Sequence, residues 1–533
     1  MGPHFHMPAR QNFYAGRSPA RGSEGMAATA HPQATLLAID ILREGGSAAD
    51  AGIAAMALLC VIEPQATGIG GDCFAVYAPG GRSPVGLNGS GRSPALATPE
   101  ALGAQGVSRI DALSAHAVTV PGAVDALCAL HARYGRLPFE RLLAPAIHAA
   151  REGYIVHDRV ARDWALYVPR LKADRVSRET LLVDGRAPVA GSRHRQPALA
   201  RTLEHIAAKG RAGFYEGPIA EGLVARLNEL GGLHSPGDFA QTRADFVDVI
   251  STEYRGLRVC EIPPNTQGVT ALMMLNVLSE FALGPEVAEH HRLHLLAEAT
   301  KAAYRRRDAL IGDPAFAGQY VERLLSPQET QRMRAEIDAH RAGAFGPLPE
   351  VQHRDTTYLC VVDRDGNALS LINSLFEAFG TGISSESGVI FQNRGASFNL
   401  QPGHPNVLAP RKRPMHTIIP AMLCKGDEAV MPFGVMGGHY QAAGHAALVS
   451  NILDLGLNVQ EALARPRSFA SEGRLLVEPG IEESVCAALI AKGHVLDMRP
   501  SPIGGGQAIW IDRASGQFVG GSDPRKDGMA LGY

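Results

Sequence analysis

The sequence has no stretch that would place the chain in a membrane or mark it for export. Its longest apolar run, residues 51–62, is too short to cross a bilayer, and the N-terminus lacks the apolar segment of a signal peptide. Cysteine is scarce too: the seven cysteines stand far apart, and no C-x-x-C pair occurs. An odd number in that arrangement favours neither a disulfide framework nor a zinc ribbon. We therefore expect a cytoplasmic protein with reduced thiols.

An excess of charge of one sign is missing as well. The chain carries 51 basic and 53 acidic residues, for a net charge of −2. This balance gives no electrostatic footprint for nucleic acid or for a membrane surface, so neither is expected as a partner. The sequence also has no H-E-x-x-H, no G-x-S-x-G and no phosphate-binding loop. What it does have is 533 residues, 45% of them hydrophobic, which is enough for a sizeable core.

The order of the expected elements indicates one layered α+β domain. Residues 1–25 are rich in Pro, Gly, Ser and Arg without periodicity, and we predict a flexible leader there. Helical patterns dominate up to about residue 343 and strands are frequent from residue 357 onward, which favours α+β layers over βαβ repeats. We predict helices at 32–41, 48–62, 223–230, 269–283 and 290–310, and strands at 74–77, 358–363, 368–376, 388–391, 421–424, 507–511 and 517–520.

Thr356 stands at the mouth of the strand predicted at 358–363. A threonine hydroxyl is a poor nucleophile until a base lies beside it. One such base is the residue's own α-amine, which exists only after the bond between Asp355 and Thr356 is cut. The free amine has a reference pKa of ~7.7–8.0, so a useful fraction is neutral at physiological pH. Taken alone, Thr356 and Thr357 at the start of a strand are more often ordinary β-formers.

Two further features fit such a nucleophile. Gly437 and Gly438 follow an apolar run at 431–436, and paired glycines after a strand let backbone N–H groups approach a substrate oxygen, as an oxyanion hole requires. Ser374 lies on the return strand of the predicted hairpin, where its hydroxyl can face Thr356 across the ladder. The alternatives are a plain turn for the glycines and an ordinary polar strand residue for Ser374.

Motifs along nearly the whole chain carry a resemblance to a known family. In the first part they are His31-Pro-Gln-Ala-Thr35, Gly45-Gly-Ser-Ala-Ala-Asp50, Gly68-Ile-Gly-Gly71, Val118-Thr-Val-Pro-Gly-Ala123, Ile262-Pro-Pro264, residues 298–308 and Gly312-Asp-Pro314. In the second part they are Asp355-Thr-Thr357, Val361-Val-Asp-Arg-Asp-Gly-Asn367, Phe379-Gly-Thr-Gly-Ile383, Arg413-Pro414, Gly437-Gly438 and Asp523-Pro-Arg525. With these motifs the chain resembles the γ-glutamyltransferase (γ-glutamyltranspeptidase, glutathione hydrolase) family.

The resemblance implies a four-layer αββα sandwich of the N-terminal-nucleophile (Ntn) hydrolase type. It implies self-cleavage between Asp355 and Thr356 into a large chain, 26–355 after the leader, and a small chain, 356–533, that stay together as one folded domain. Carried over by position, Thr356 is the nucleophile, Ser374 stands where a threonine supports the new N-terminus, and Gly437 and Gly438 form the oxyanion hole.

The activity implied by the resemblance is acyl transfer from a small-molecule amide. A threonine acyl-enzyme forms and is released by water or an amine, without any cofactor. The large and small chains associate after cleavage, and a homodimer is compatible with this reading. A non-catalytic binding protein on the same fold is the alternative of another class, against which the retained Asp355-Thr356 and Gly437-Gly438 argue.

The expected substrate pocket departs from the family pattern. The family's arginine that holds the glutamyl carboxylate falls on Ser90, with Arg92 close by as its candidate replacement. The aspartate that holds the glutamyl ammonium falls on Ser397, and a pocket asparagine falls on Phe376. Losing an ion-pair partner at a desolvated site costs roughly 2–5 kcal/mol, so we expect altered specificity.

Two more departures follow in the sequence. A pair of serines in the family becomes His416-Thr417, and the segment 399–411 is shorter than the loop that covers the site in many members. Relatives with a pocket altered in this way include proteins resembling oxamate amidohydrolase and cephalosporin acylase. A small-amide hydrolase or a β-lactam side-chain acylase is therefore the alternative to γ-glutamyl transfer.

One histidine pattern invites a metal interpretation. His290, His294 and Glu298 lie at i, i+4 and i+8 on one face of the helix predicted at 290–310, a spacing that can present metal ligands. The alternative is a solvated or hydrogen-bonded helix face, which the ordinary packing residues that follow favour. We therefore predict no metal site.

Overall fold

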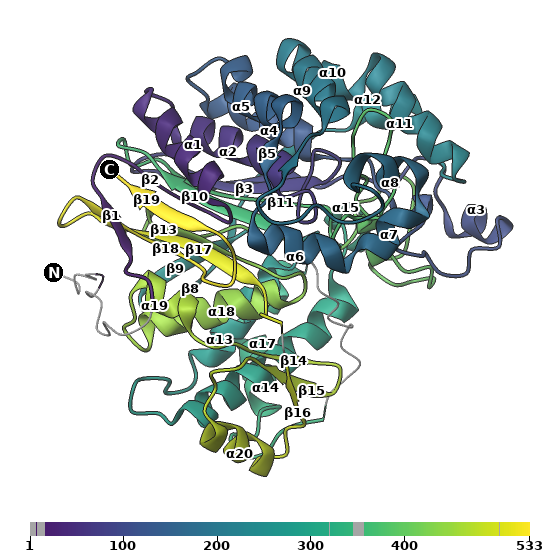
Figure 1. Ribbon diagram of the computed structural model, residues 1–533. Coiled ribbons are helices and arrows are strands. Elements are labelled where there is room, and N and C mark those ends of the chain that lie inside the picture. Colours follow the sequence, from purple (N-terminus) through teal and green to yellow (C-terminus); the bar gives the residue numbers. More distant parts are fainter. Residues whose placement is uncertain (1–6, 8–15, 319, 345–355, 500) are drawn as a thin grey trace.

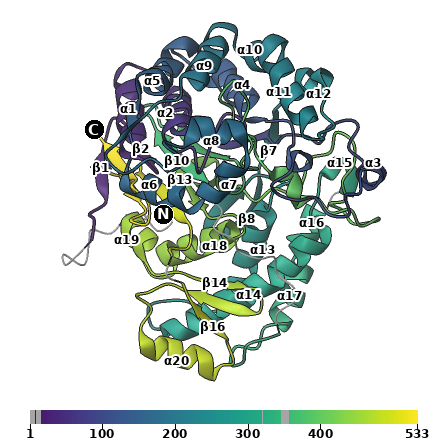
Figure 2. The same cartoon turned by 45° about the vertical axis from the view of Figure 1, so that its right-hand side comes forward.

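Two stacked sheets lie between two layers of helices (Figure 1). The computed structural model describes residues 7, 16–318, 320–344, 356–499 and 501–533. Within these residues, each of the two large sheets has seven strands. The sheets meet face to face, and helices cover the outer side of each one, as the turned view in Figure 2 also shows. This is the predicted αββα sandwich.

The first sheet carries the segment that begins at Thr356. Its strand order is β19-β2-β10-β11-β3-β4-β7, and all the pairings within it are antiparallel. The central hairpin β10–β11 is therefore bonded to β2 on one side and to β3 on the other. Its strands are β2 (Met26–Thr29), β3 (Asp72–Ala78), β4 (Val85–Gly89), β7 (Asp245–Asp248), β10 (Thr357–Val362), β11 (Ala368–Ser374) and β19 (Met529–Gly532).

The second sheet carries the paired glycines at the end of one of its central strands. Its order is β1-β18-β17-β13-β12-β9-β8, again antiparallel throughout. Its strands are β1 (Ala20–Gly22), β8 (Ile250–Tyr254), β9 (Leu257–Glu261), β12 (Ala421–Lys425), β13 (Glu428–Met436), β17 (Gly505–Asp512) and β18 (Gln517–Ser522). Two small sheets pair β14 (Ser468–Ser471), β15 (Arg474–Val477) and β16 (Leu496–Met498), and β5 (Tyr154–Ile155) with β6 (Arg193–His194).

The helices divide between the two outer faces. Most of those in the first 241 residues lie on the side of the first sheet, toward the top of Figure 1, and most of the later ones lie on the side of the second. The former are α1 (Pro32–Arg43), α2 (Ala48–Ile62), α3 (Pro99–Ala104), α4 (Ala123–Tyr134), α5 (Phe139–Glu152), α6 (Asp158–Leu166), α7 (Val168–Ala173), α8 (Arg175–Leu181), α9 (Pro197–Lys209), α10 (Ala212–Tyr215), α11 (Gly217–Glu229) and α12 (Pro236–Gln241). The latter are α13 (Gly268–Leu278), α14 (Glu289–Leu310), α15 (Pro314–Ala317), α16 (Val321–Leu324), α17 (Pro327–Ala335), α18 (Tyr440–Leu453), α19 (Val459–Ala464) and α20 (Glu483–Ala491), with short 3₁₀ turns at Ala115–Ala117 and Arg394–Ser397.

Helix α2 illustrates how the sequence produces this packing. Ser47 caps it: its hydroxyl accepts from the Asp50 N–H, and the Asp50 carboxylate accepts from the Ser47 N–H. All fifteen residues of the helix are buried, as its nearly continuous apolar composition predicts. At Gly52 the helix comes so close to β11 that a Cβ would lie 2.2 Å from the Leu369 side chain. The glycine is therefore what allows the helix to lie against the sheet at this depth.

The inner faces of the two sheets are joined by polar as well as apolar contacts. Tyr358 on β10 lies against Gly434 on β13, where a Cβ would meet the tyrosine ring at 2.4 Å. The Tyr358 hydroxyl is 2.8 Å from the Ser370 Oγ, which in turn donates to the Phe433 carbonyl oxygen at 3.1 Å. These contacts hold β10 and β11 in a fixed position over β13.

The local predictions mostly hold, with two corrections. The helices at 32–41 and 48–62 and the hairpin of β10 and β11 are confirmed within a few residues. Part of the predicted leader is wrong: residues 20–22 form β1, because their backbone groups complete the edge of β18. The strand predicted at 388–391 is also wrong. Gly388 has φ +80° in a tight turn, and only an isolated bridge joins Ser384 to Ile390. No helix among the described residues is long and apolar enough to cross a membrane.

Candidate active site

Thr356 lies immediately before β10, buried between the layers. Its side chain is 2% exposed, and its Oγ1 lies 3.0 Å from the Oγ of Ser374, the last residue of β11. The structure therefore brings together the two hydroxyls that the sequence pairs across the hairpin. The next residue, Thr357, donates its hydroxyl to the Glu63 carboxylate at 2.6 Å, which ties the start of β10 to the end of helix α2. Asp355 lies outside the described residues.

Ser374 also fixes the backbone that follows it. Its Oγ accepts from the Phe376 N–H at 2.9 Å. Phe376 has φ +81°, a conformation that a bulky side chain adopts only where the surroundings impose it. The ring of Phe376 lies under the guanidinium of Arg394, whose Cζ is 3.9 Å from the ring centroid. The turn after β11 thus connects the threonine–serine pair to a buried cation.

Arg394 and Gln267 link this cation to the second sheet. Arg394 Nη1 donates to the Thr417 Oγ1 at 2.9 Å. The Gln267 side-chain amide donates to the carbonyl oxygens of Thr417, at 2.7 Å, and of Gly438, at 3.1 Å. Arg307 Nη1 donates to the Gln267 Oε1 at 2.8 Å and so orients that amide. A continuous set of contacts therefore runs from the end of β11 to the paired glycines.

Gly437 and Gly438 connect β13 to α18. Their φ angles are +121° and +59°, in the region that favours glycine. A Cβ on Gly437 would lie 2.9 Å from the Cα of Gly504, so this position has no room for a side chain. In the part of the chain that the structure describes, neither glycine N–H has a hydrogen-bond acceptor. The pair can therefore supply donors to a substrate oxygen.

Asp72 is a buried hub that the sequence reasoning did not assign. It is the register partner of Ser374 on β3. Its carboxylate accepts from the N–H groups of Gly91 at 2.9 Å and Gly122 at 3.1 Å, from the Gln392 amide at 2.9 Å, and from the His416 Nε2 at 3.0 Å. These donors hold the carboxylate without any exposure to solvent. Asp72 directly follows the motif Gly68-Ile-Gly-Gly71, and this position in the sequence is the signal that could have identified it.

His416 is neutral and acts as a positioning residue for Asp72. Burial, together with the nearby positive charge of Arg394, lowers the pKa of the imidazole to about 3, even though Asp72 favours its charged form. The neutral ring donates from Nε2 to Asp72, and its Nδ1 faces the Ile418 N–H at 3.4 Å. The predicted pocket residues His416 and Thr417 thus contact Asp72 and Arg394.

Arg92 lies in a cluster of charged residues separate from the contacts around Thr356 and Arg394. It is 3.5 Å from Asp313 and 3.8 Å from Asp245, and it donates to the Arg411 carbonyl oxygen at 3.2 Å. Burial and the neighbouring Arg413 lower the pKa of its guanidinium, while Asp313 and Asp245 oppose that shift. These partners hold the side chain beside the start of β7 and the N-terminus of α15, and no hydrogen bond or ion pair joins it to Thr356 among the described residues.

Ser90 and Ser397 take the positions where the family carries charge. The Ser90 Oγ accepts from the Asn265 amide at 3.1 Å, and its carbonyl oxygen accepts from Arg413 Nε at 3.1 Å. Ser397 ends the 3₁₀ turn that begins at Arg394, and its buried Oγ has no hydrogen-bond partner among the described residues. Arg394, three residues before Ser397, is a fully buried cation in this turn. The sequence reasoning quoted the stretch 393–398 but assigned a role only to Ser397.

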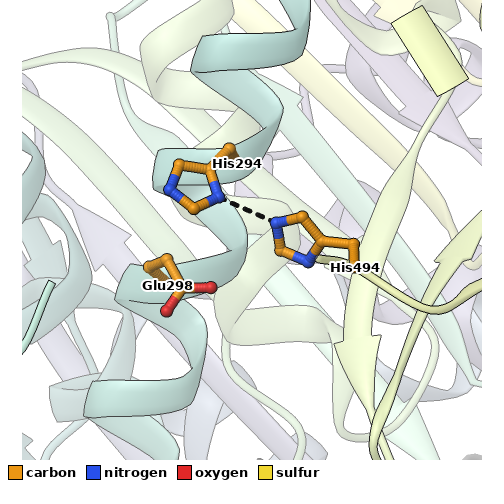
Figure 3. A group of neighbouring side chains, drawn as sticks. All are labelled: His294, Glu298 and His494. Atoms are coloured by element: carbon orange, nitrogen blue, oxygen red, sulfur yellow. Dashed lines mark hydrogen bonds between the residues drawn. The ribbon is translucent and has the colours of Figure 1, made fainter. Parts of the chain in front are cut away.

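The histidine pattern on α14 meets a third residue from another element. His294, Glu298 and His494 bring one ligand atom each within 4.8 Å of one another, whereas His290 is not part of the group (Figure 3). His294 Nε2 donates to the Asp338 carbonyl oxygen at 2.8 Å, which leaves Nδ1 to accept from His494 Nε2 at 2.8 Å. Burial lowers the pKa of both rings, that of His494 to about 3.

Glu298 in the same group also has its own partners. Its carboxylate accepts from Lys301 Nζ at 2.5 Å and from the Gly343 N–H at 3.1 Å. Each of these three side chains thus has a hydrogen-bond partner within the chain. The absence of a metal site stays a prediction.

Comparison with known proteins places this geometry in context. The Gamma-glutamyltranspeptidase family profile matches residues 34–533. The chain belongs to the γ-glutamyltranspeptidase family. It is an enzyme of the hydrolase and acyltransferase type that this Ntn fold carries.

Two curated relatives match almost end to end. One is the glutathione hydrolase-like YwrD proenzyme of Bacillus subtilis, 34% identical over 526 residues, which cover 96% of this chain and 99% of the relative. The other is the oxamate amidohydrolase proenzyme of Klebsiella pneumoniae, 36% identical over 529 residues with the same coverage. Among solved structures, the cephalosporin acylase of Bacillus halodurans superposes with a TM-score of 0.92 at 38% identity, covering 99% of both chains.

Proposed function

We propose that this γ-glutamyltranspeptidase-family protein cleaves itself before Thr356 and then hydrolyses a small amide through a threonine acyl-enzyme. The observation that carries the proposal is the Thr356 hydroxyl, buried at the mouth of β10 and 3.0 Å from the Ser374 hydroxyl. Relatives that match nearly the whole chain are called proenzymes, which supports self-cleavage.

In the proposed reaction the free α-amine of Thr356 accepts the proton of its own hydroxyl. The Oγ1 then bonds to the amide carbon, and the carbonyl oxygen becomes an oxyanion that the N–H groups of Gly437 and Gly438 stabilise. The C–N bond breaks, and the leaving amine takes the proton from the α-ammonium. Water then attacks the Thr356 ester and gives a proton to the α-amine; the bond between the acyl carbon and Oγ1 breaks, Oγ1 takes that proton from the α-ammonium, and the acid leaves. Hydrolysis by water and transfer to an amine acceptor differ only in this last step.

The fold supports lasting association of the two chains after cleavage. The hairpin β10–β11 of the small chain is hydrogen-bonded to β2 and to β3 of the large chain. Separating the chains would break both ladders and expose the first sheet. The seven cysteines are free thiols, five of them buried, which supports our proposal of a reducing, cytoplasmic setting.

Two purified proteins, the wild type and Thr356→Ala, test the proposed self-cleavage. Purified wild-type protein on a denaturing gel should give two bands, the smaller one beginning at Thr356 by N-terminal sequencing. Thr356→Ala should remain one chain, because it keeps the backbone but lacks the hydroxyl. Wild-type protein that stays intact and still hydrolyses amides would contradict the mechanism.

A further inference from the structure

A partly open cavity lies in the helix layer over the second sheet, and it shares no lining residue with the contacts described around Thr356. Its walls are α14, α18 and the segment 465–468 between α19 and β14 (Figure 1), and it encloses about 690 Å³, including its opening to solvent. Five leucines line it: Leu278, Leu283, Leu293, Leu296 and Leu448. Space remains between them because three lining positions carry small residues, Gly444, Ala447 and Ala462. The cavity therefore suits an apolar group.

The cavity is long, and its two ends differ. Helices α14 and α18 run antiparallel: Arg292 near the start of α14 contacts Ser450 near the end of α18. At the opposite end, the Tyr304 hydroxyl donates to the carbonyl oxygen of His439, just before α18. The α18 wall runs from Tyr440 to Ser450, ten residues and roughly 15 Å along the helix axis. Tyr440 is 2% exposed, whereas Arg292 is half-buried, so the cavity is closed at Tyr440 and open at Arg292.

Arg292 brings a positive charge without a counter-ion to the open end. It forms no ion pair within the described part of the chain, and its buried Nε has no hydrogen-bond partner there. Its Nη2 donates to the Ser450 Oγ over a long 3.4 Å. Burial, and next the neighbouring Arg465, lower the pKa of this guanidinium, while Asp454 and Glu289 oppose that shift. A partly desolvated cation of this kind gains from an anionic ligand.

The two acids near Arg292 already have partners. Glu289 accepts from Arg465 Nη2 at 2.6 Å, and Asp454 accepts from Arg255 Nε at 2.7 Å. Three guanidinium groups thus face two carboxylates, and one positive charge is left in excess at the open end. The local field therefore favours an anion there and opposes an ammonium.

The other charge in the wall does not alter this balance. Arg467 also lines the cavity, but it is buried and paired to Asp523. An apolar, closed end and a cationic, open end together match an amphiphile that carries one negative charge.

We propose that this cavity binds an aliphatic carboxylate, with the carboxylate at Arg292 and the chain directed toward Tyr440. A guanidinium suits the head because its fork of donors matches both oxygens of a carboxylate. The leucines and the small residues between them suit the chain, since burial of its methylene groups removes apolar surface from water. The site is independent of the reaction proposed at Thr356.

Three eight-carbon ligands test the charge preference by isothermal titration calorimetry on wild-type protein. Octanoate has the carboxylate, 1-octanol has the chain without a charge, and octylammonium has the opposite charge. Octanoate should bind once per chain and on the order of 10–100-fold more tightly than octanol, as expected for a hydrogen-bonded charge. Octylammonium should bind most weakly of the three.

Arg292→Gln tests the residue that carries the preference. It should weaken octanoate binding on the order of 10–100-fold and leave octanol binding unchanged. Arg292→Lys keeps the charge and should fall between the two. The matched control is Arg201→Gln, which removes the same charge from an exposed position on α9 and should bind octanoate like wild type. Thermal melting checks that each variant is folded.

Ala447→Phe tests the place of binding without touching a charge. Ala447 lines the cavity and is half-buried, so the larger ring should fill the space and abolish binding of octanoate and octanol alike. If Arg292→Gln does not fold, the three ligands and Ala447→Phe decide. The proposal is overturned if wild type does not bind octanoate or binds the three ligands equally. Unchanged octanoate binding in folded Arg292→Gln or Ala447→Phe would overturn it as well.

Discussion

At the scale of single residues, the Ser374 hydroxyl joins Thr356, the proposed nucleophile, to the backbone of Phe376. Ser374→Ala removes the group 3.0 Å from the Thr356 Oγ1 and leaves the Phe376 N–H without that acceptor. A buried donor that loses its partner costs about 1–3 kcal/mol. We therefore expect self-cleavage and kcat to fall roughly 10- to 100-fold. Ser374→Thr keeps the hydroxyl and should retain most of both rates, measured by gel densitometry and by anilide hydrolysis. Equal rates in all three proteins would remove Ser374 from the mechanism.

Gly437 tests the oxyanion hole at the same scale. Gly437→Ala adds a Cβ 2.9 Å from the Gly504 Cα, so the backbone must shift and its N–H must turn. Loss of one such donor lowers kcat ~10²–10³-fold in hydrolases. Gly45→Ala is the matched control, because Gly45 also has a positive φ, +93°, but has open space where its Cβ would lie. It should cost some stability and leave kcat unchanged. If Gly437→Ala keeps full kcat, the two glycines form only a turn and do not act as an oxyanion hole.

At the scale of elements, the contact between α2 and the first sheet depends on Gly52. Gly52→Ala would place a Cβ 2.2 Å from the Leu369 side chain, and overpacking of this kind costs typically 1–3 kcal/mol. Gly222→Ala on α11 meets no atom within 4 Å and should instead stabilise its helix by roughly 0.5–1 kcal/mol. Chemical denaturation of both variants measures the difference. If Gly52→Ala leaves the free energy of unfolding unchanged or raises it, helix α2 can move away from the first sheet without a loss of stability.

At the scale of the whole molecule, buried histidines make stability depend on pH. Burial lowers the pKa of His31 and His416 to about 3 and that of His194 and His234 to about 4. Between the ordinary pKa near 6.5 and those values, the unfolded chain binds protons that the folded chain does not. The free energy of unfolding therefore falls as pH drops through this window, by up to about 1.4 kcal/mol per pH unit for each histidine.

His194 offers a clean test of that slope. Its ring packs against Trp164 at 5.0 Å and Tyr154 at 5.9 Å, and its Nε2 has no hydrogen-bond partner among the described residues. His194→Phe keeps an aromatic ring and removes one titrating group. Denaturation should give similar stability to wild type at pH 7.5 and a shallower loss between pH 6.5 and 4. Parallel curves for the two proteins would show that His194 does not contribute to the pH dependence.

Local pattern accounts for much of the secondary structure and for the pairing of Thr356 with Ser374. The cap at Ser47, the apolar run after it and the hairpin turn at 363–367 are determined by neighbours along the chain, so α2, β10 and β11 could be predicted closely. Thr356 and Ser374 face each other because a two-stranded ladder fixes its own register. The prediction of a strand at 388–391 failed because apolar residues there close a turn around Gly388 instead.

Tertiary structure decided which charged side chains are buried near Thr356. Arg394 is far from Asp72, Ser90 and Arg92 in the sequence, and nothing local states which of the two arginines contacts Phe376. The packed fold brings Arg394 over the ring of Phe376, while Asp313 at the start of α15 and Asp245 at the start of β7 hold Arg92. The sequence by itself determined many of the elements and the hairpin, since these depend on short-range periodicity and turn chemistry, and its motifs indicated Thr356 as the nucleophile through the family resemblance. Only the packed fold decided which charges remain inside, because the desolvation of a side chain is a property of everything that surrounds it.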